Sequence, residues 1–419
     1  MNKQNTALLY RYGRERCFIW IAKICIVGVI LFLGGLITSI VWKGWHGFLS
    51  SEVQIEIMLD PNIIGIQGEK TSLSYQKLIK NTLREKFPEA TSRAEKKQIY
   101  SIISAGAGVL LQEKVQDDLK NIGKPIIVWL PAGAIAASYF KGATNVASLQ
   151  EKKIPAIHIQ RLEKLKQTGK TRNSFNYNFF ISADSRNPEM AGIGNALRGS
   201  FYTLLITFFI AFPTGTLTAV YLELFAPRAK WCRWWLDFLE ININNLAAVP
   251  SIIFGLLGLA IFINIFHLPR SSPLLGGVVL ALMTLPTIII VARAALKSVP
   301  PSLLAVALSL GATRMQGVLH HVLPAAMPGI LTGTIIGMAQ ALGETAPLLM
   351  LGMVAFIANA PESITDAATV LPVQIFLWAS SPESGFAERT SMAIIILLFF
   401  LVIMNAVAVF LRHRLEIKW

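Results

Sequence analysis

The sequence predicts an all-α polytopic membrane protein with six transmembrane helices and a small α+β exported domain between helices 1 and 2. Of its 419 residues, 53% are hydrophobic and 15% are charged, as expected for a membrane protein that also carries water-soluble mass. Apolar runs of about 20 residues, the length that spans a bilayer, recur along the chain. Lysines and arginines gather at alternate ends of these runs, as the positive-inside rule expects of cytoplasmic loops.

The first apolar run covers residues 18–42 and follows a basic, polar segment at residues 1–17. A secretory signal would have a shorter apolar core and a small-residue cleavage site, and neither is evident. We therefore expect transmembrane helix 1 at residues 18–42 and a cytoplasmic N-terminus at residues 1–17. The segment that follows is expected to lie in the periplasm.

Residues 43–198 have the composition of a water-soluble domain and are numerous enough to bury a core. Alternating apolar residues and β-branched runs predict strands, and the spacing of Tyr75, Leu78, Ile79 and Leu83 predicts a helix. The predicted strands are residues 51–59, 125–130 and 173–182, and one or two further helices are predicted within residues 94–122.

Five further apolar runs form a membrane core over residues 199–411, and residues 412–419 form a cytoplasmic C-terminus. Basic residues place the loops after the second and fourth helices in the cytoplasm, whereas the acidic loop at residues 358–389 lies outside. The predicted spans are residues 199–225, 246–266, 274–291, 329–356 and 392–411. The basic residues that decide this orientation are Lys3, Arg11, Arg14, Arg16, Arg228, Lys230, Arg233, Arg293, Lys297, Arg314, Arg412, Arg414 and Lys418.

Several functions are excluded by the placement of charges and motifs. The net charge of +14 does not indicate nucleic acid, because much of it lies in the membrane-flanking loops. Gly169-Lys170-Thr171 resembles the end of a phosphate-binding loop, but Lys164 stands where such a loop requires glycine. We therefore expect no ATPase site, no catalytic residue, no metal site and no cofactor in this chain.

Residues 297–324 are too polar and too interrupted to span a membrane, yet they have helical periodicity on both sides of Gly311. A short helix, a glycine turn and a second helix would form a knob projecting from the membrane. Such a knob can dock into a groove on another protein.

The next apolar segment carries a glycine at every fourth position, at Gly329, Gly333 and Gly337, which allows two membrane helices to pack closely. At 100° per residue, Gln340 and Glu344 fall on the same face. An acid within an apolar segment is costly enough to indicate function, although a buried structural acid is the alternative. Nearby polar or helix-breaking positions are Gly343, Thr345, Pro347 and, after Pro250 in another span, Ser251.

Several motifs together resemble the permease subunits of ABC-type phosphate importers. The motifs are the Gly311 to Leu323-Pro324 spacing, PAAMPGILTG, LGETAPLL, LAAVPSIIFGLLGLAIF, ALMTLPTIII and TVLPVQIFLWASSPE. They occur in order and cover roughly the second half of the chain. The exported segment is an addition that shorter members of the family lack.

The resemblance implies a function for each of these regions. Residues 199–411 would be an ABC importer permease core, in which the coupling loop docks on an ATPase subunit through Ala305, Ala307, Leu308 and Leu310. Gly311 would reverse the chain, and Leu323-Pro324 would lead into the next helix. The translocation path would include Gln340, Gly343, Glu344, Thr345, Pro347 and Ser251.

The implied partners are a second, homologous permease, two ATPase subunits that use ATP, a periplasmic phosphate-binding protein and the lipids of the bacterial inner membrane. The chain departs from the family at Ala305-Val306-Ala307, where Glu-Ala-Ala is common. It also has Gln340 and Ile290 where members often have arginine. Cations near the phosphate would then come from the partner permease, or amides and hydroxyls would hold the anion.

Two alternatives stay open at the level of sequence. The chain could be a permease for another oxyanion, such as molybdate or sulfate. It could also be a membrane-anchored sensor or interaction protein that acts through its exported domain.

Overall fold

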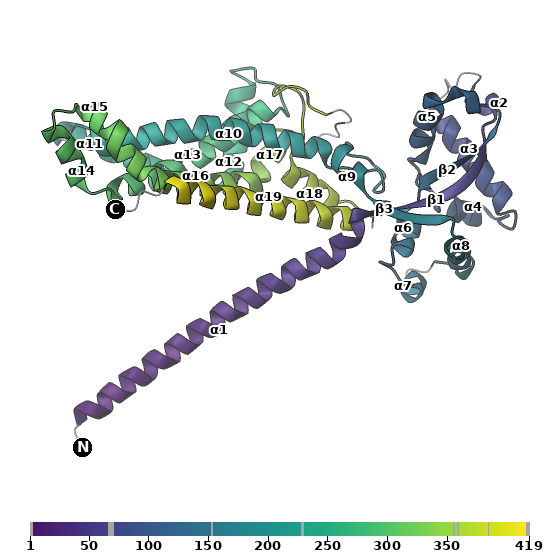
Figure 1. Ribbon diagram of the computed structural model, residues 1–419, viewed down its shortest axis with the longest axis horizontal. Helices are drawn as coiled ribbons and strands as arrows, with labels where there is room; N and C mark the ends of the chain where they lie inside the picture. Colours follow the sequence, from purple (N-terminus) through teal and green to yellow (C-terminus); the bar gives the residue numbers. More distant parts are fainter. Residues whose placement is uncertain are drawn as a thin grey trace.

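The computed structural model describes residues 3–65, 71–151, 154–227, 230–354, 357, 360–383 and 385–415. The molecule is elongated, with a helical bundle at one end and a domain built on a small sheet at the other (Figure 1). A single long helix, α1, leaves the junction of these two parts at an angle to the bundle.

Helix α1 (Lys3–Trp45) is 43 residues long and begins far upstream of the predicted residue 18. No proline interrupts the basic N-terminal segment, so the helix continues through it. In the isolated chain, none of the most apolar stretch of this helix is buried. Only its last turn and the adjoining η1 (His46–Phe48) meet the bundle, where a Cβ on Gly44 would lie 2.6 Å from Ile395 Cδ1.

The domain at the other end of the molecule, called the sheet domain below, contains a three-stranded antiparallel sheet in the order β2-β1-β3. The strands are β1 (Leu49–Met58), β2 (Pro125–Pro131) and β3 (Thr171–Phe175). Val53, Ile55 and Ile57 alternate with polar residues on β1 and are buried, so one face of the sheet carries the core. The strands predicted at residues 51–59 and 125–130 are confirmed.

Helices complete this domain and contribute much of its core. Tyr75, Leu78, Ile79 and Leu83 are buried along α3, as their spacing predicted. The helices are α2 (Pro61–Ile64), α3 (Ser72–Lys86), α4 (Arg93–Tyr100), α5 (Ala107–Asp117), η2 (Leu119–Asn121), α6 (Ala134–Phe140), α7 (Val146–Glu151) and α8 (Ala156–Gln167).

The strand predicted at residues 173–182 is wrong in its second half. Strand β3 ends at Phe175, and helix α9 (Tyr177–Ile181) follows it. The side chain of Asn176 accepts a hydrogen bond from the backbone N–H of Phe179, so this residue caps a helix where the apolar sequence resembled a strand.

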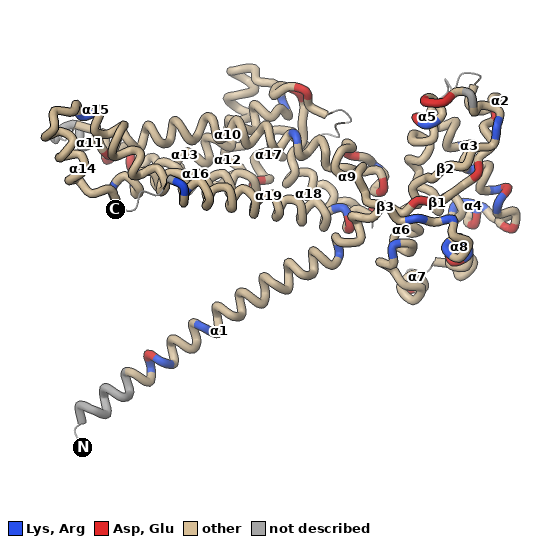
Figure 2. Tube along the Cα trace, viewed as in Figure 1, with Lys and Arg blue, Asp and Glu red and all other residues tan. Residues whose placement is uncertain are grey.

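The bundle is built from α10 (Gly194–Val220), α13 (Pro273–Ser298), α16 (Leu323–Gly343) and α19 (Gly385–Leu415). Helix α13 packs between α10 and α16, and α16 also packs on α19. The bundle is almost free of charge along its length, and charged residues concentrate at its ends and in the sheet domain (Figure 2). Within the described residues five helices could cross a membrane by length and composition, or six if a bent pair counts as one span.

The span predicted at residues 246–266 is not a continuous helix. Helix α11 (Lys230–Ala247) ends before Pro250. After it, α12 (Ser251–Leu257) continues directly into the π-helix η4 (Gly258–Ile263), and this second segment makes an angle of 103° with α11. Pro250 cannot donate a helical hydrogen bond and disfavours helix at the preceding residue, so the chain bends there. The segment before it, predicted as a short loop, is helical instead.

The loop predicted at residues 358–389 contains a buried helix, α18 (Leu371–Ala379), packed on α10 and α19. Its nine residues are too few to span a membrane, which is why the sequence resembled a loop. Ser200 on α10 accepts a hydrogen bond from the backbone N–H of Leu371 at 2.7 Å, which fixes the start of this helix.

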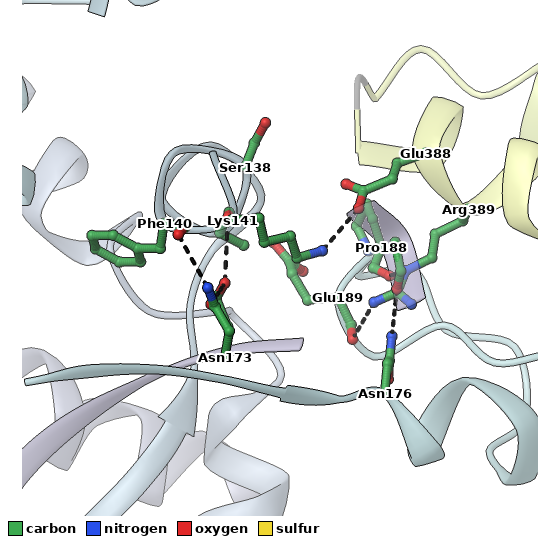
Figure 3. A network of polar contacts seen from close by, with 12 residues as sticks. Ser138, Phe140, Lys141, Asn173, Asn176, Pro188, Glu189, Glu388 and Arg389 are labelled. Carbon is green, nitrogen blue, oxygen red and sulfur yellow. Dashed lines mark hydrogen bonds and ion pairs between the residues drawn. The ribbon is translucent and has the colours of Figure 1, made fainter. Parts of the chain in front are cut away.

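A buried polar network joins the sheet domain to the bundle (Figure 3). Lys141 Nζ lies 2.9 Å from Glu388 Oε1, and the lysine side chain is only 5% exposed. Burial lowers the pKa of Lys141, and the charge of Glu388 partly offsets this effect. Arg389 donates to the backbone oxygens of Pro188 at 2.7 Å and Glu189 at 2.9 Å.

Replacing Glu388 should destabilise this junction more than replacing an exposed ion pair. Glu388→Gln leaves the buried Lys141 ammonium without a counter-charge, at a cost of about 3 kcal/mol. Glu52→Gln, which removes the exposed pair with Arg172, should cost at most about 1 kcal/mol. Thermal unfolding of the detergent-solubilised chain measures both, and the double variant Lys141→Met/Glu388→Leu should recover part of the loss. Equal losses in the two single variants would contradict the buried role of the pair.

Candidate transport site and docking hairpin

The helix that carries the candidate acid ends earlier than its apolar sequence predicted. Helix α16 stops at Gly343, and Glu344 is extended at φ −73° and ψ 125°. The chain then starts α17 (Ala346–Met350), with Pro347 in its first turn. Because a proline ring excludes a helix through the residues before it, Pro347 begins a new helix instead of weakening a continuous one. Glu344 therefore lies at a break, and its predicted position within a helix was wrong.

The helix break at Pro250, between α11 and α12, lies beside the break at Glu344. A Cβ on Gly255 of α12 would come within 2.8 Å of Pro347 Cα, and one on Gly258 within 2.6 Å of Leu351 Cδ2. These contacts show that α12 and α17 run parallel and nearly touch. Ser251, one turn before Gly255 on the same face, therefore lies at the level of the Glu344-Thr345 break. From this packing we expect Ser251 to lie near Thr345 and Glu344, and the assignment of these residues to a translocation path stays a prediction.

The side chains at the break are polar and accessible in this chain. Glu344 and Thr345 are half-buried, while Gln340 and Gly343 are exposed. Across the described ranges, no hydrogen bond or ion pair involves the Glu344 side chain, and Thr345 Oγ1 reaches only the oxygen of Gly343 at 3.5 Å. Nor do three His, Cys, Asp or Glu side chains gather in the described part of the chain to hold a metal ion. The available groups are therefore hydroxyls, one carboxylate and backbone amides.

The glycine stripe of α16 packs against α13 of the same chain. A Cβ would lie 2.6 Å from Ala295 Cβ at Gly329, 2.4 Å from Val291 Cγ1 at Gly333 and 3.4 Å from Ile288 Cγ1 at Gly337. The contact is close at Gly329 and Gly333 and looser at Gly337. The close helix packing that the glycine spacing predicted is therefore made inside the chain, between α16 and α13.

The segment after α13 forms the predicted helical hairpin. Helix α14 (Pro301–Ser309) is followed by Gly311 at φ +88°, a conformation that favours glycine, and by α15 (Arg314–Gly317). The chain continues through the π-helix η5 (Val318–Val322) directly into α16 at Leu323, with Pro324 in the first turn.

The hairpin exposes a row of apolar side chains. Leu310 is 83% exposed at the tip, and Val306, Leu308 and Met315 are exposed beside it. Ala307, predicted to contact a partner, is instead buried, and its Cβ packs at 3.5 Å from the position a Cβ would take on Gly317. Small residues at these two positions let the two arms of the hairpin approach each other.

Ion pairs hold the end of α13, which leads into the hairpin, and a hydrogen bond from Arg314 holds the hairpin itself. Arg293 of α13 lies 3.1 Å from Glu240 of α11 and 3.6 Å from Glu223 of the π-helix η3 (Tyr221–Phe225). Lys297 also reaches Glu223 at 3.7 Å, and Arg314 donates to the backbone oxygen of Leu224. Of the basic residues used to predict the topology, Arg228 and Lys418 lie outside the described residues, and the side chains of Lys3, Arg11, Lys230 and Arg233 are not among those described.

Sequence reasoning missed Gly255 and Gly258, which allow α12 to approach α17. Their three-residue spacing within an apolar run was a usable signal, because small residues at this spacing permit close helix contact. Helix α18 was also missed, although Pro372 near its start is typical of a first helical turn.

Comparison with known proteins places this architecture in a family. The family described as binding-protein-dependent transport system inner membrane component matches residues 211–417, and a domain of unknown function, DUF3333, matches residues 5–150. The phosphate transport system permease protein PstA of Haemophilus influenzae is 32% identical over 232 residues, which are 54% of this chain and 78% of that protein.

Two further relatives are the probable ABC transporter permease proteins YqgI and YqgH of Bacillus subtilis. They are 33% and 32% identical over 42% and 46% of this chain, and the chain spans only 58% and 62% of their length. Among solved structures, an inward-facing MetNI methionine ABC transporter chain aligns at 18% identity and a TM-score of 0.42, covering 53% of this chain and 97% of that chain.

The matched residues cover most of the bundle and the hairpin. The chain therefore belongs to the class of multi-pass inner membrane permeases of binding-protein-dependent transport systems. Within that class, the chain belongs to the family of PstA-like ABC transporter permeases, on the identity and coverage shared with the H. influenzae protein.

An exchange of two small residues tests the contact between α16 and α13. Gly329→Ala should place a methyl group against Ala295 and destabilise the chain by about 1–3 kcal/mol. Adding Ala295→Gly should restore most of the loss, because the next nearest atom to a Cβ on Gly329 is the Cα of residue 295, at 3.5 Å. Thermal unfolding is the measurement, and Gly343→Ala on the same helix, with nothing within 4 Å, is the control. Failure of the exchange to restore stability would exclude this contact.

Proposed function

We propose that the chain is the permease subunit that translocates inorganic phosphate across the inner membrane, driven by separate ATPase subunits. The observation that carries the proposal is the pair of adjacent helix breaks at Pro250 and at Glu344-Thr345 within an otherwise apolar bundle. The phosphate transport proteins among its relatives support the choice of anion.

Helix breaks of this kind supply groups that bind an anion inside a membrane. The first N–H groups of a helix have no partner within the helix, and in transporters such half-helix ends line substrate sites. Here α12 and α17 begin next to each other, so their first turns and the hydroxyls of Ser251 and Thr345 can donate hydrogen bonds. These donors suit phosphate oxygens, which accept hydrogen bonds.

Glu344 has a role that is compatible with an anionic substrate. A carboxylate can accept a hydrogen bond from a protonated phosphate oxygen, or it can orient an arginine that binds phosphate directly. Because Gln340 and Ile290 stand where arginines are common in the family, such an arginine would come from a second, homologous permease. Glu344 is unpaired among the described residues, which leaves it available for either role.

The proposed topology follows from the basic residues at the hairpin end of the bundle. Arg293, Lys297 and Arg314 gather there, so this end and both termini would be cytoplasmic, and residues 43–198 would be periplasmic. The exposed apolar tip of the hairpin would dock on an ATPase subunit, and a periplasmic phosphate-binding protein would deliver the substrate. The chain itself would bind no ATP.

Phosphate uptake tests the proposed path. Glu344→Gln should lower uptake by at least about tenfold, since a hydrogen bond to a charged group is worth about 1.5–3 kcal/mol. Gln340→Arg should retain uptake or increase it, because it adds a cation beside the break. The assay uses whole cells with the partner subunits at matched expression, and Glu362→Gln, in an exposed loop, is the control.

If wild type and Glu344→Gln take up phosphate equally, Glu344 is a structural acid and the path assignment is wrong. If the wild type takes up sulfate or molybdate instead of phosphate, the proposed path is retained and the proposed substrate is wrong.

Docking of the ATPase subunit is tested at the hairpin tip. Leu310→Asp places a charge in the centre of the proposed apolar contact, so ATPase co-purification should fall by about tenfold or more and uptake should fall with it. Leu73→Asp, at a 72% exposed leucine in the sheet domain, is the matched control and should change neither measurement. Full retention of the ATPase by Leu310→Asp would move the docking surface elsewhere.

A further inference from the structure

The sheet domain contains a basic cavity that no part of the proposed transport path uses. The cavity has a volume of about 320 Å³ and lies between the C-terminal end of α3, helix α8 and the turn that precedes β3. Four cationic side chains line it, from Lys86, Arg161, Lys164 and Lys170. Glu89 is the one carboxylate among the described lining residues, so the cavity carries a clear excess of positive charge.

Arg161 is the one buried charged residue among the described residues that line this cavity. It is only 7% exposed, and its Nε and Nη1 atoms are buried without a hydrogen-bond partner in the described residues. The contact that the structure does give it is with the Phe87 ring, whose centroid lies 6.0 Å from the guanidinium carbon. A buried charged group without partners is costly, and folded proteins rarely retain one unless something binds it.

Among the described residues, no carboxylate forms an ion pair with Arg161. His158 lies one turn earlier on α8, is buried, and has an unpartnered Nδ1. Burial, and then the charge of Arg161, lower the pKa of His158, so this side chain is neutral at neutral pH. The pKa of Lys86 is lowered by burial of its ammonium and next by the charge of Lys170, and the charge of Glu56 offsets part of this effect.

The position of Lys170 depends on a turn that resembles a nucleotide-binding motif in sequence only. Gly169 has φ +68°, which reverses the chain after α8 and brings Lys170 back to the cavity. Lys164, which stands where a phosphate-binding loop requires glycine, lines the same cavity. Lys170, which belongs to the motif, and Lys164, which departs from it, therefore line one cavity.

We propose that this cavity binds a small anion that carries a phosphate group, either inorganic phosphate or the monophosphate of an organic ester. The planar guanidinium of Arg161 offers two parallel donors, which match phosphate oxygens, and the lysines supply point charges around it. The volume falls at the lower end of the range for small-molecule sites. The wall formed by Phe87 can cover the organic part of an ester. This site does not rest on the proposed function of the bundle.

Isothermal titration of the purified full chain in detergent tests the site with sodium phosphate and glycerol 3-phosphate as probes. Arg161→Gln and Lys170→Gln should each weaken binding by about tenfold or more, because each removes a charged donor. Lys124→Gln, which removes an exposed charge of the same domain away from the cavity, should leave the affinity unchanged. Lys170 is exposed, so its variant remains informative if Arg161→Gln fails to fold.

The proposed transport path could also bind phosphate, so the titration is repeated in a Glu344→Gln background. Binding that persists there and is lost with Lys170→Gln supports the cavity independently of the path. Binding of the ester alone supports the cavity and identifies an organic phosphate as its ligand. No binding of either probe to the wild type, or equal binding by the wild type and both cavity variants, would overturn the proposal.

Discussion

In a lipid bilayer every backbone N–H and C=O group must find a partner inside the protein, and this constraint explains most of the bundle. Continuous helices α10, α13, α16 and α19 satisfy it with their own hydrogen bonds. The two interruptions, at Pro250 and at Glu344-Thr345, occur where α12 and α17 pack against each other. Irregular backbone at membrane depth is tolerated when protein covers it or when it lines a polar path. The location of the breaks therefore coincides with the location of the candidate site.

The hairpin is linked mechanically to one of these breaks. From Arg314 the chain runs through α15, η5 and α16 to Gly343 without leaving the helical conformation. Ion pairs at Arg293 and Lys297 hold the end of α13, which leads into the hairpin, to η3 and α11. A displacement of the hairpin by a docked protein would thus be transmitted along α16 to the break beside Glu344. Under the proposed function, this helix couples ATPase closure to the path.

The sheet domain is attached at the opposite end by a compact polar junction. Lys141, Glu388 and Arg389 connect it to the start of α19, close to where α1 meets the same helix (Figure 3). Buried ion pairs define geometry more than they add stability, since most of their attraction offsets the loss of hydration. The junction therefore sets the orientation of the domain relative to the bundle. The basic cavity, between α3, α8 and β3, lies in the body of that domain and not at the junction.

Sequence by itself determined the features that depend on local periodicity. The apolar runs identified the long helices, alternation identified β1 and β2, and Gly311 identified the turn of the hairpin. These signals are local because the side chains that decide them are neighbours along one helix or strand. The resemblance of the second half of the chain to permeases was also readable, since it rests on short ordered motifs.

Only the tertiary structure decided how interrupted segments pair. Pro347 could have kinked a continuous helix, and its role as the start of α17 depends on Gly255 of α12, nearly a hundred positions away in the sequence. The same is true of α18, whose nine residues form a helix because α10 and α19 bury it. The cavity of Arg161 likewise needs Lys86 and Lys170 from separate elements. Contacts between distant segments supply the burial and the hydrogen bonds that make such features stable, and no periodicity along the chain encodes them.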